Sequence, residues 1–257
     1  MSNLAEKIIE KNADITKFPV DEHKLKKDGT FKRVPNNNTE ERWVHPIREK
    51  DDIKRVSFYL LEKAKNEENQ DRKEVAYRNW LLFTIGINVG LRVSDLIDLK
   101  WSHFLKSDMK TFVENINKKE KKTGKMKSIC PNECIKKSIN EYLDVTGLKP
   151  KRNQYMFLNM RTGERITDAV VEKLIKDFAE KCELEGNYNT HSLRKTYAYQ
   201  KYMLYVENGD PLALVKVQKD LNHRNSSDTA RYLGITKEEQ FNSSMQLGDY
   251  LMDYIAF

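Results

Sequence analysis

Apolar residues recur at helical spacing from about residue 46 onward, whereas residues 1–45 show little such periodicity. Pro46 stands just upstream of the first periodic stretch, as a helix start signal does. The apolar positions of that stretch are Ile53, Val56, Leu60, Leu61 and Ala64. The pattern predicts a long helix here. Residues 1–45 are expected to form an N-terminal arm, flexible or partly helical, with a short helix near 4–11.

A second apolar stretch predicts another long helix, which ends near Gly90. Its apolar positions are Val75, Trp80, Leu81, Phe83, Ile85 and Ile87. Gly90 suits the left-handed conformation that closes many helices. Ser94 follows and is placed to cap a short helix over 95–99.

The pattern then changes from helical to strand-like and back. β-like runs lie at 111–116 and 126–129, and the lysine-rich segment between them has Gly124 in its turn. Helical patterns follow at about 132–145, 168–182, 191–207, 211–220, 226–233 and 236–246. The order α-α-β-β-β-α predicts an α+β fold, mostly α-helical, with one small antiparallel sheet. Residues 241–257 predict an amphipathic tail.

Composition and charge narrow the class of protein. The chain has 257 residues, of which 33% are charged, and no apolar run approaches the roughly 18 residues of a membrane span. The N-terminus lacks a secretory signal pattern. The three cysteines of the chain lack C-x-x-C spacing, which argues against a zinc site and fits a reducing compartment. We therefore expect a cytoplasmic protein that does not enter the membrane.

The net charge of +7 and a pI near 9.0 favour an anionic partner. The positive charge is concentrated in one segment, which carries Lys118, Lys119, Lys121, Lys122, Lys125 and Lys127. A solvated charged face is the alternative reading. The concentration of lysines favours nucleic acid.

Arg92 follows an apolar helix and a Gly-Leu turn, so its guanidinium is expected to be rigidly placed. An arginine can grip two phosphate oxygens at once, which a lysine cannot. The alternative is an exposed arginine after a helix end. Asp95, three residues on, is expected either to orient Arg92 through a charge-assisted hydrogen bond or to be a first-turn acid favoured by the helix dipole.

Two further pairs combine a histidine with another polar residue at regular spacing. His191 and Arg194 are one helical turn apart, which lets them share a phosphate while the histidine handles a proton. An amphipathic helix with a solvated polar pair is the alternative. His223 precedes Tyr232 by nine residues, across a turn-and-cap sequence that predicts a helix from about Ser227. Tyr232 is singled out from the other tyrosines only by this spacing.

Four segments in fixed order carry these residues: GINVGLRVSDLIDLKW (86–101), KKTGKMKSICP (121–131), HSLRKTYA (191–198) and LNHRNSSDTARYLG (221–234). Over about residues 46–235 the chain resembles the tyrosine recombinase (phage integrase) family. The resemblance implies that family's catalytic-domain fold over 46–240. It also implies six catalytic residues: Arg92, Lys122, His191, Arg194, His223 and the nucleophile Tyr232. Lys121 and Lys125 remain alternatives for the hairpin lysine.

The activity that the resemblance implies is site-specific recombination of double-stranded DNA. Tyr232 is expected to form a 3′-phosphotyrosyl bond while the two arginines stabilise the phosphorane. Lys122 is expected to protonate the leaving oxygen, His191 to help deprotonate the tyrosine, and His223 to donate a hydrogen bond to a phosphate oxygen. No metal, cofactor or ATP is expected. Candidate DNA contacts are Lys119, Lys121, Lys125, Lys127 and Lys195.

Two features depart from the family pattern. Asn222 stands where the family usually has glycine, and no helical core-binding domain is evident in residues 1–45. Two alternatives therefore stay open: a conjugative relaxase or topoisomerase-like nicking-closing enzyme, and a DNA-binding protein that no longer cuts. Self-association through residues 241–257, accessory DNA-binding factors and a nucleoid-associated location complete the expectation.

Overall fold

The computed structural model describes residues 43–234. Most of the expected arm (1–45), the helix expected at 236–246 and the tail (241–257) lie outside the described residues. The first described residues already contact the rest of the fold, since the backbone N–H of His45 donates to the carbonyl of Asn187 at 2.8 Å.

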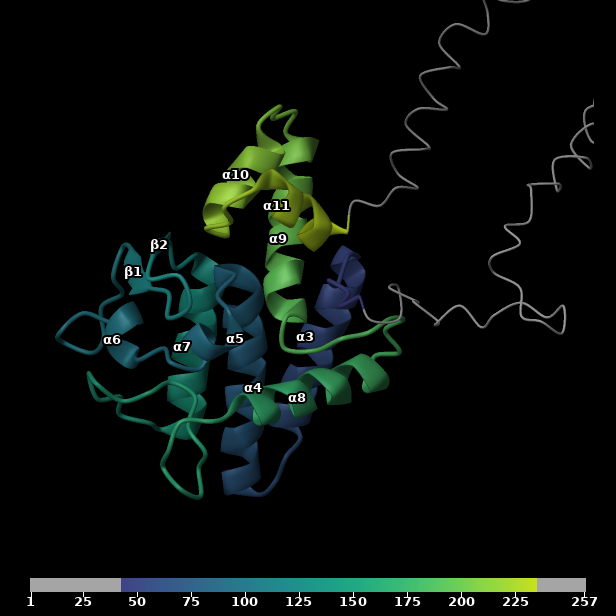
Figure 1. The fold of residues 1–257 in the computed structure, drawn as a ribbon. Helices are drawn as coiled ribbons and strands as arrows, with labels where there is room; N and C mark the ends of the chain where they lie inside the picture. Colours follow the sequence, from purple (N-terminus) through teal and green to yellow (C-terminus); the bar gives the residue numbers. More distant parts are fainter. Residues whose placement is uncertain (1–42, 235–257) are drawn as a thin grey trace, which may run out of the picture. The chain divides into compact units, whose positions relative to one another are not determined.

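Helix α4 (Gln70–Val89) forms the centre of the fold, and α3 (Lys50–Lys65), α7 (Glu133–Thr146) and α9 (Ser192–Glu207) pack around it (Figure 1). The helix is buried on several sides, which explains why its apolar residues form no single stripe. Both long helices expected before Gly90 are confirmed, and each extends several residues beyond its apolar positions.

Gly90 ends α4 in the left-handed conformation, with φ 59° and ψ 32°. A β-carbon at this position would lie 2.1 Å from a ring carbon of Tyr197, a residue of α9. Glycine is therefore required twice here, once by the backbone angle and once by the approach of α9. The next residues enter the short helix α5 (Val93–Leu96), which begins two residues earlier than the sequence pattern indicates.

The sheet is smaller than expected. Strands β1 (Ile116–Lys119) and β2 (Met126–Ile129) pair antiparallel, with Ile116 opposite Ile129. The expected strand at 111–116 is wrong for most of its length. Within it Phe112 makes only an isolated bridge to Leu105, because the Asp108 carboxylate fixes a turn by accepting the N–H groups of residues 110 and 111. Helix α6 (Trp101–Phe104), which the pattern did not indicate, precedes that turn.

The later helices follow the predicted order: α8 (Asp168–Lys181), α10 (Ala213–Asp220) and α11 (Ser226–Leu233). Helices α10 and α11 pack on α9 around a small apolar cluster that is separate from the main core. This cluster contains Ala198, Val217, Leu221 and Leu233. The fold is α+β and mostly helical, as expected, with one two-stranded antiparallel sheet among the described residues. None of the helices described between residues 43 and 234 is long and apolar enough to cross a membrane.

Candidate active site

Arg194 is the most deeply buried of the six expected catalytic residues, with 2% of its surface exposed. Its Nη1 donates to the carbonyl of Gly90 at 2.8 Å, and its Nη2 donates to the carbonyl of Leu221 at 2.6 Å. Arg194 lies on α9, whereas these two carbonyls end α4 and α10. The guanidinium is therefore fixed by three helices at once.

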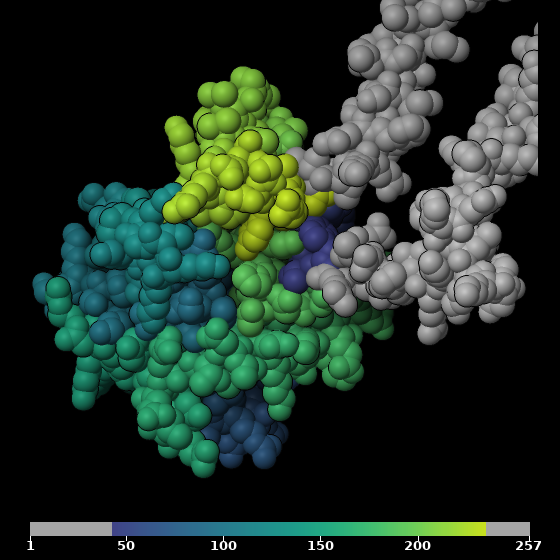
Figure 2. Space-filling view, viewed as in Figure 1, coloured from purple at the N-terminus to yellow at the C-terminus, as the bar shows by residue number. Residues whose placement is uncertain are grey.

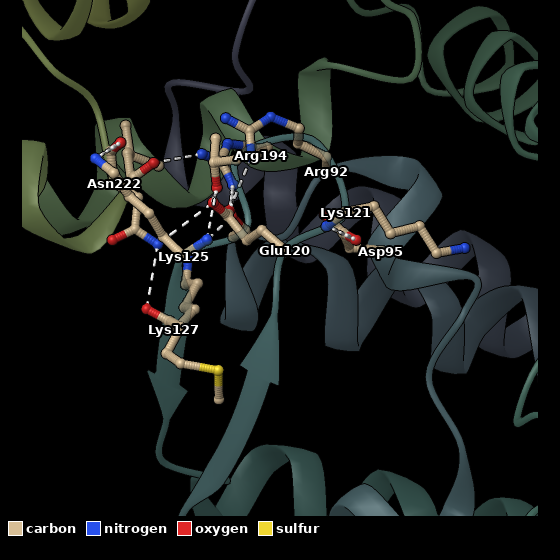
Figure 3. A network of polar contacts seen from close by, with 12 residues as sticks. Arg92, Asp95, Glu120, Lys121, Lys125, Lys127, Arg194 and Asn222 are labelled. Carbon is tan, nitrogen blue, oxygen red and sulfur yellow. Dashed lines mark hydrogen bonds and ion pairs between the residues drawn. The ribbon is translucent and has the colours of Figure 1, made fainter.

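Arg92 meets Arg194 at a carboxylate that the sequence analysis did not select. The Oε1 atom of Glu120 lies 2.9 Å from Nη1 of Arg92 and 3.1 Å from Nη1 of Arg194 (Figure 3). Glu120 is fully buried, and burial alone would raise its pKa. A hydrogen bond from Thr123 and the charges of the two arginines outweigh that effect and hold the pKa at about 2.

The signal for Glu120 was present in the strand pattern. Ile116 faces the core at the start of β1, and side chains alternate along a strand, so position 120 returns to the inner side. Without knowing which strand positions face inward, there was no reason to select Glu120, a single acid among lysines.

Asp95 lies in the first turn of α5, which is the second of the two expected alternatives, and its carboxylate makes no bond to Arg92. The residue is fully buried, and its Oδ1 accepts the backbone N–H of Lys121 at 3.0 Å, across to the hairpin. The carboxylate that pairs with Arg92 is Glu120 (Figure 3). Asp95 thus anchors the lysine-bearing turn, and the expected charge-assisted bond to Arg92 is replaced by that anchor.

The hairpin lysines divide by partner. Lys118 and Lys121 pair with Asp98 at 3.3 and 3.0 Å, and Lys125 donates to the carbonyl of Asn222 at 3.2 Å. Lys122 is exposed in the turn, and it has no hydrogen bond or ion pair to any described residue. This leaves its amine free to meet a substrate.

Two lysines expected to contact DNA are buried instead. Lys127 is 5% exposed and donates to the carbonyl of Gly90 at 3.0 Å, and burial is the main cause that lowers its pKa to about 7. Lys195 is 7% exposed and donates to the carbonyl of Val44 at 2.7 Å. Burial, followed by the charge of Arg48, lowers the pKa of Lys195 to about 8. Both amines are bonded to backbone carbonyls, so a direct contact of Lys127 or Lys195 with DNA stays a prediction.

His191 occupies the N-cap position of α9 without a capping bond from its side chain and stays exposed, while Arg194 points inward, so the two do not share one solvated face. The Asn189 carboxamide oxygen accepts the N–H of His191 at 2.9 Å, which fixes the turn that leads into the helix. Burial and the charges of Lys195, Arg194 and Lys122 lower the pKa of His191. The imidazole is therefore neutral near pH 7.

His223 and Tyr232 lie against each other, with ring centroids 5.2 Å apart and ring planes at 82°. Nδ1 of His223 is 3.1 Å from the hydroxyl of Thr229 on α11. Burial and the charges of Arg194 and Arg92 lower the pKa of His223 to about 4. The ring is neutral, and a hydroxyl that donates to Nδ1 leaves the proton on Nε2.

Tyr232 is half-buried on α11, next to a hollow of about 340 Å³. That hollow is lined by Trp43, Lys195, His223, Asp228, Arg231 and Tyr232. Burial raises the pKa of the phenol, and the charges of Arg194 and Arg92 oppose the rise without cancelling it. Both arginines thus act on the hydroxyl of Tyr232. A larger hollow of about 750 Å³, lined partly by Leu60, Val75 and Leu174, lies away from these residues.

The hairpin and the α11 segment lie side by side on one face of the protein. In the space-filling view the teal hairpin and the yellow α11 segment border each other on the same side (Figure 2). The contact between Lys125 and Asn222 joins the two segments there. Among the described residues, no group of three or more His, Cys, Asp or Glu side chains is arranged to hold a metal ion.

A helical fold with one small hairpin, two arginines meeting near a tyrosine and a lysine at the hairpin tip is the arrangement of a tyrosine-recombinase catalytic domain. The phage integrase family model matches residues 59–239. The chain belongs to this family.

Individual relatives agree with the family. The chain is 32% identical over 195 residues to the probable integrase/recombinase YoeC of Bacillus subtilis (strain 168). The aligned region covers 76% of this chain and 92% of YoeC. It is also 32% identical over 184 residues to the tyrosine recombinase XerC of Caldanaerobacter subterraneus subsp. tengcongensis, covering 70% of this chain and 48% of XerC. The chain spans about half the length of this second relative.

The fold itself matches the crystal structure of the XerH site-specific recombinase bound to a palindromic difH substrate in a post-cleavage complex. The TM-score is 0.56 at 22% identity, over 76% of this chain and 51% of XerH. Fold and relatives together make the chain a tyrosine recombinase.

Proposed function

We propose that this chain breaks and rejoins double-stranded DNA at specific sites through a 3′-phosphotyrosyl intermediate. One observation carries the proposal: Arg92 and Arg194 converge on a single carboxylate oxygen of Glu120. The charges of both arginines also oppose the rise that burial causes in the pKa of the Tyr232 phenol. Two guanidinium groups converging beside a phenol suit a single phosphate diester. The relatives are integrases and recombinases, which favours recombination over the relaxase, topoisomerase-like and non-cutting alternatives.

In the proposed reaction the oxygen of Tyr232 attacks phosphorus, a bond from phosphorus to the phenol oxygen forms, and the bond to the 5′ oxygen breaks. The phenol proton leaves to a neutral imidazole, for which we propose His191. Arg92 and Arg194 stabilise the charge on the pentacoordinate phosphorus, where preorganised donors contribute most. No described contact joins His191 to Tyr232, so this proton acceptor rests on the lowered pKa of His191 and on the family resemblance.

Two further groups complete the proposed chemistry. Lys122 gives a proton to the leaving 5′ oxygen, which its exposed and unpaired amine supports. His223 donates its Nε2 proton to a non-bridging phosphate oxygen. The neutral ring and the contact of Nδ1 with Thr229 support that direction. Religation reverses both steps, so the reaction requires neither ATP nor a metal ion.

We also propose that the chain acts on DNA as more than one copy. XerH was crystallised on a palindromic substrate, and a palindrome offers two equivalent half-sites to two copies related by a two-fold axis. Lys119, Lys121 and Lys125 are the proposed phosphate contacts on the hairpin. Docking of residues 241–257 on a neighbouring copy, accessory factors and a location on the nucleoid in the cytoplasm remain parts of the same proposal.

The test compares the wild type with Tyr232→Phe on a supercoiled plasmid that carries DNA from either side of the gene encoding this chain. Both proteins are incubated in EDTA, and protein–DNA adducts are detected after denaturation. We expect an adduct and relaxed plasmid from the wild type, and DNA binding without an adduct from Tyr232→Phe. An adduct that persists in Tyr232→Phe would assign the nucleophile elsewhere. Tight wild-type binding with no adduct would favour the non-cutting alternative.

A further inference from the structure

Glu120 joins all four motif segments of the site. Its Oε1 pairs with Arg92 and Arg194, which come from the first and third segments. Its Oε2 accepts the hydroxyl of Thr123 at 2.8 Å, in the turn beside Lys122, and the carboxamide of Asn222 at 3.3 Å, in the fourth segment (Figure 3). A single buried carboxylate therefore fixes the two arginines relative to the lysine turn and to the loop that carries His223.

The two arginines depend on Glu120 to different degrees. Arg194 keeps two backbone carbonyls, those of Gly90 and Leu221, as partners besides the carboxylate. Arg92 pairs with Glu120 alone among the described residues, and its Nη1 makes an ion pair there without a well-angled hydrogen bond. The orientation of Arg92 consequently rests on this carboxylate, and its N–H groups remain able to donate to a ligand oxygen.

Asn222 is explained by the same contact. It adopts φ 55°, the left-handed region that glycine enters freely and asparagine tolerates. Its side chain donates to Glu120 and also lies 3.5 Å from the carbonyl of Met126. The residue that departs from the family's glycine thus keeps the backbone conformation and adds a side-chain tie to the hairpin.

The partners of Glu120 distinguish a supporting carboxylate from one that merely fills the phosphate position before DNA binds. Glu120 is fully buried, and both of its oxygens are occupied by protein groups from four segments. An anion that only holds the place of a phosphate would be expected to pair with the two arginines and not to be bonded to Thr123 and Asn222 as well. The contacts place Glu120 behind the guanidinium groups as a brace.

We propose that Glu120 is a positioning residue of the strand-cleavage reaction, which orients Arg92 and Arg194 toward one phosphate and, through Asn222, ties the lysine turn to the His223 loop. This inference deepens the proposed function and rests on it. Glu120 touches no reacting atom itself and acts through the arginines.

The first test observes the arginines directly in the DNA-free protein, by NMR of ¹⁵N-labelled guanidinium groups in the wild type, Glu120→Gln and Asn222→Gly. In Glu120→Gln we expect the guanidinium of Arg92 to lose its restricted rotation, while that of Arg194 stays restricted by its two carbonyls. Arg78 is the matched control, because it is buried and bonds to Leu158 and Asn79 far from Glu120 in sequence. An Arg92 signal unchanged in a folded Glu120→Gln protein would overturn the proposal.

The second test measures single-turnover adduct formation on the same plasmid DNA. Loss of a residue that orients catalytic groups lowers activity about 10- to 100-fold, which is the decrease expected for Glu120→Gln. Removing a negative charge favours DNA binding, so a slower reaction at saturating DNA traces to geometry. Asn222→Gly, which keeps the loop conformation, should be slowed less, and its effect should not add to that of Glu120→Gln.

The opposite result is informative as well. Adduct formation as fast as the wild type, or faster, in Glu120→Gln would identify Glu120 as a competing anion and overturn the positioning role. If the wild type forms no Tyr232-dependent adduct on any DNA, the proposed function fails, while the NMR comparison still decides whether Glu120 orients Arg92.

Discussion

The arginine cluster (Arg92, Arg194 and Glu120) is joined to the turn that carries Lys122 by the hydrogen bond from Thr123 to Glu120, yet the two regions differ in almost every physical respect. In the cluster, charges are buried and paired, and backbone carbonyls fix Arg194. In the turn, the amine of Lys122 is exposed and unpaired. The groups that would stabilise charge are thus arranged in advance, where preorganisation matters most, whereas the proton donor takes its final position from the substrate.

Arg194→Ala should separate the two regions most clearly. Removing Arg194 takes one of the two guanidinium partners from buried Glu120 and leaves the carbonyls of Gly90 and Leu221 without their side-chain donor, which costs about 3–5 kcal/mol of unfolding free energy. Losing a preorganised donor should also slow adduct formation by roughly 100- to 1000-fold. Urea unfolding and single-turnover cleavage measure the two effects. Arg194→Lys, which keeps a charge but loses the planar fork, is the control, and it should recover stability more than rate. Equal stability of Arg194→Ala and the wild type would contradict the buried pairing.

Lys122→Ala tests the other region. We expect adduct formation to slow by about 100- to 10,000-fold, because general acid catalysis is lost. Stability should change by less than about 0.5 kcal/mol, as for other exposed positions. Lys119→Ala is the matched control, since that lysine is also exposed on the hairpin, and it should weaken DNA binding without removing the chemistry. A large rate loss in Lys121→Ala or Lys125→Ala with a normal Lys122→Ala would reassign the acid.

The contrast between these two regions also shows which parts of the fold and site could be predicted from the sequence. Motif spacing selected Arg92, Arg194, His223 and Tyr232, and the helices that carry Arg194 and Tyr232 were predicted from helical patterns and cap residues. These features are local: a helix face, a cap or a nine-residue spacing needs no knowledge of the partner segment.

The features that the sequence analysis missed depend on which way a strand residue faces. Lys127 and Glu120 lie in a lysine-rich stretch that reads as a solvated surface, yet both side chains face the interior. Strand β2 buries Lys127 together with Ile129. The strand expected at 111–116 failed for a similar reason, since apolar residues such as Phe112 can pack in a turn as well as in a sheet. Strand parity becomes useful only once the register is known.

Gly90→Ala should disturb the arginine cluster through the backbone carbonyl that holds Arg194. A left-handed alanine costs about 1–2 kcal/mol, and displacing the Tyr197 ring adds an overpacking penalty of about 1–3 kcal/mol. Gly147→Ala is the matched control, because its φ is 64° and nothing lies within 4 Å of the added carbon, so only the first cost applies. Urea midpoints give the difference. The Gly90 carbonyl holds Arg194 and Lys127, so only Gly90→Ala should also slow cleavage. Equal losses in both variants would remove the steric argument.

Lys127→Met asks whether a buried amine sets the pH dependence of stability. Burial lowers the pKa of Lys127 from 10.5 to about 7, so between these values the unfolded chain holds a proton that the folded chain lacks. Unfolding then takes up a proton, and stability rises with pH by about 1.4 kcal/mol per unit from this group alone.

In Lys127→Met that contribution to the slope between pH 7 and 9 should vanish, while Lys122→Met, which alters an exposed amine, should keep it. Urea unfolding at several pH values compares the three proteins, and the difference between variants cancels titration of Lys195, which burial shifts in the same direction. If Lys127→Met and the wild type show the same slope, the amine stays charged beside Gly90, and the cluster carries a third fixed positive charge rather than a neutral donor.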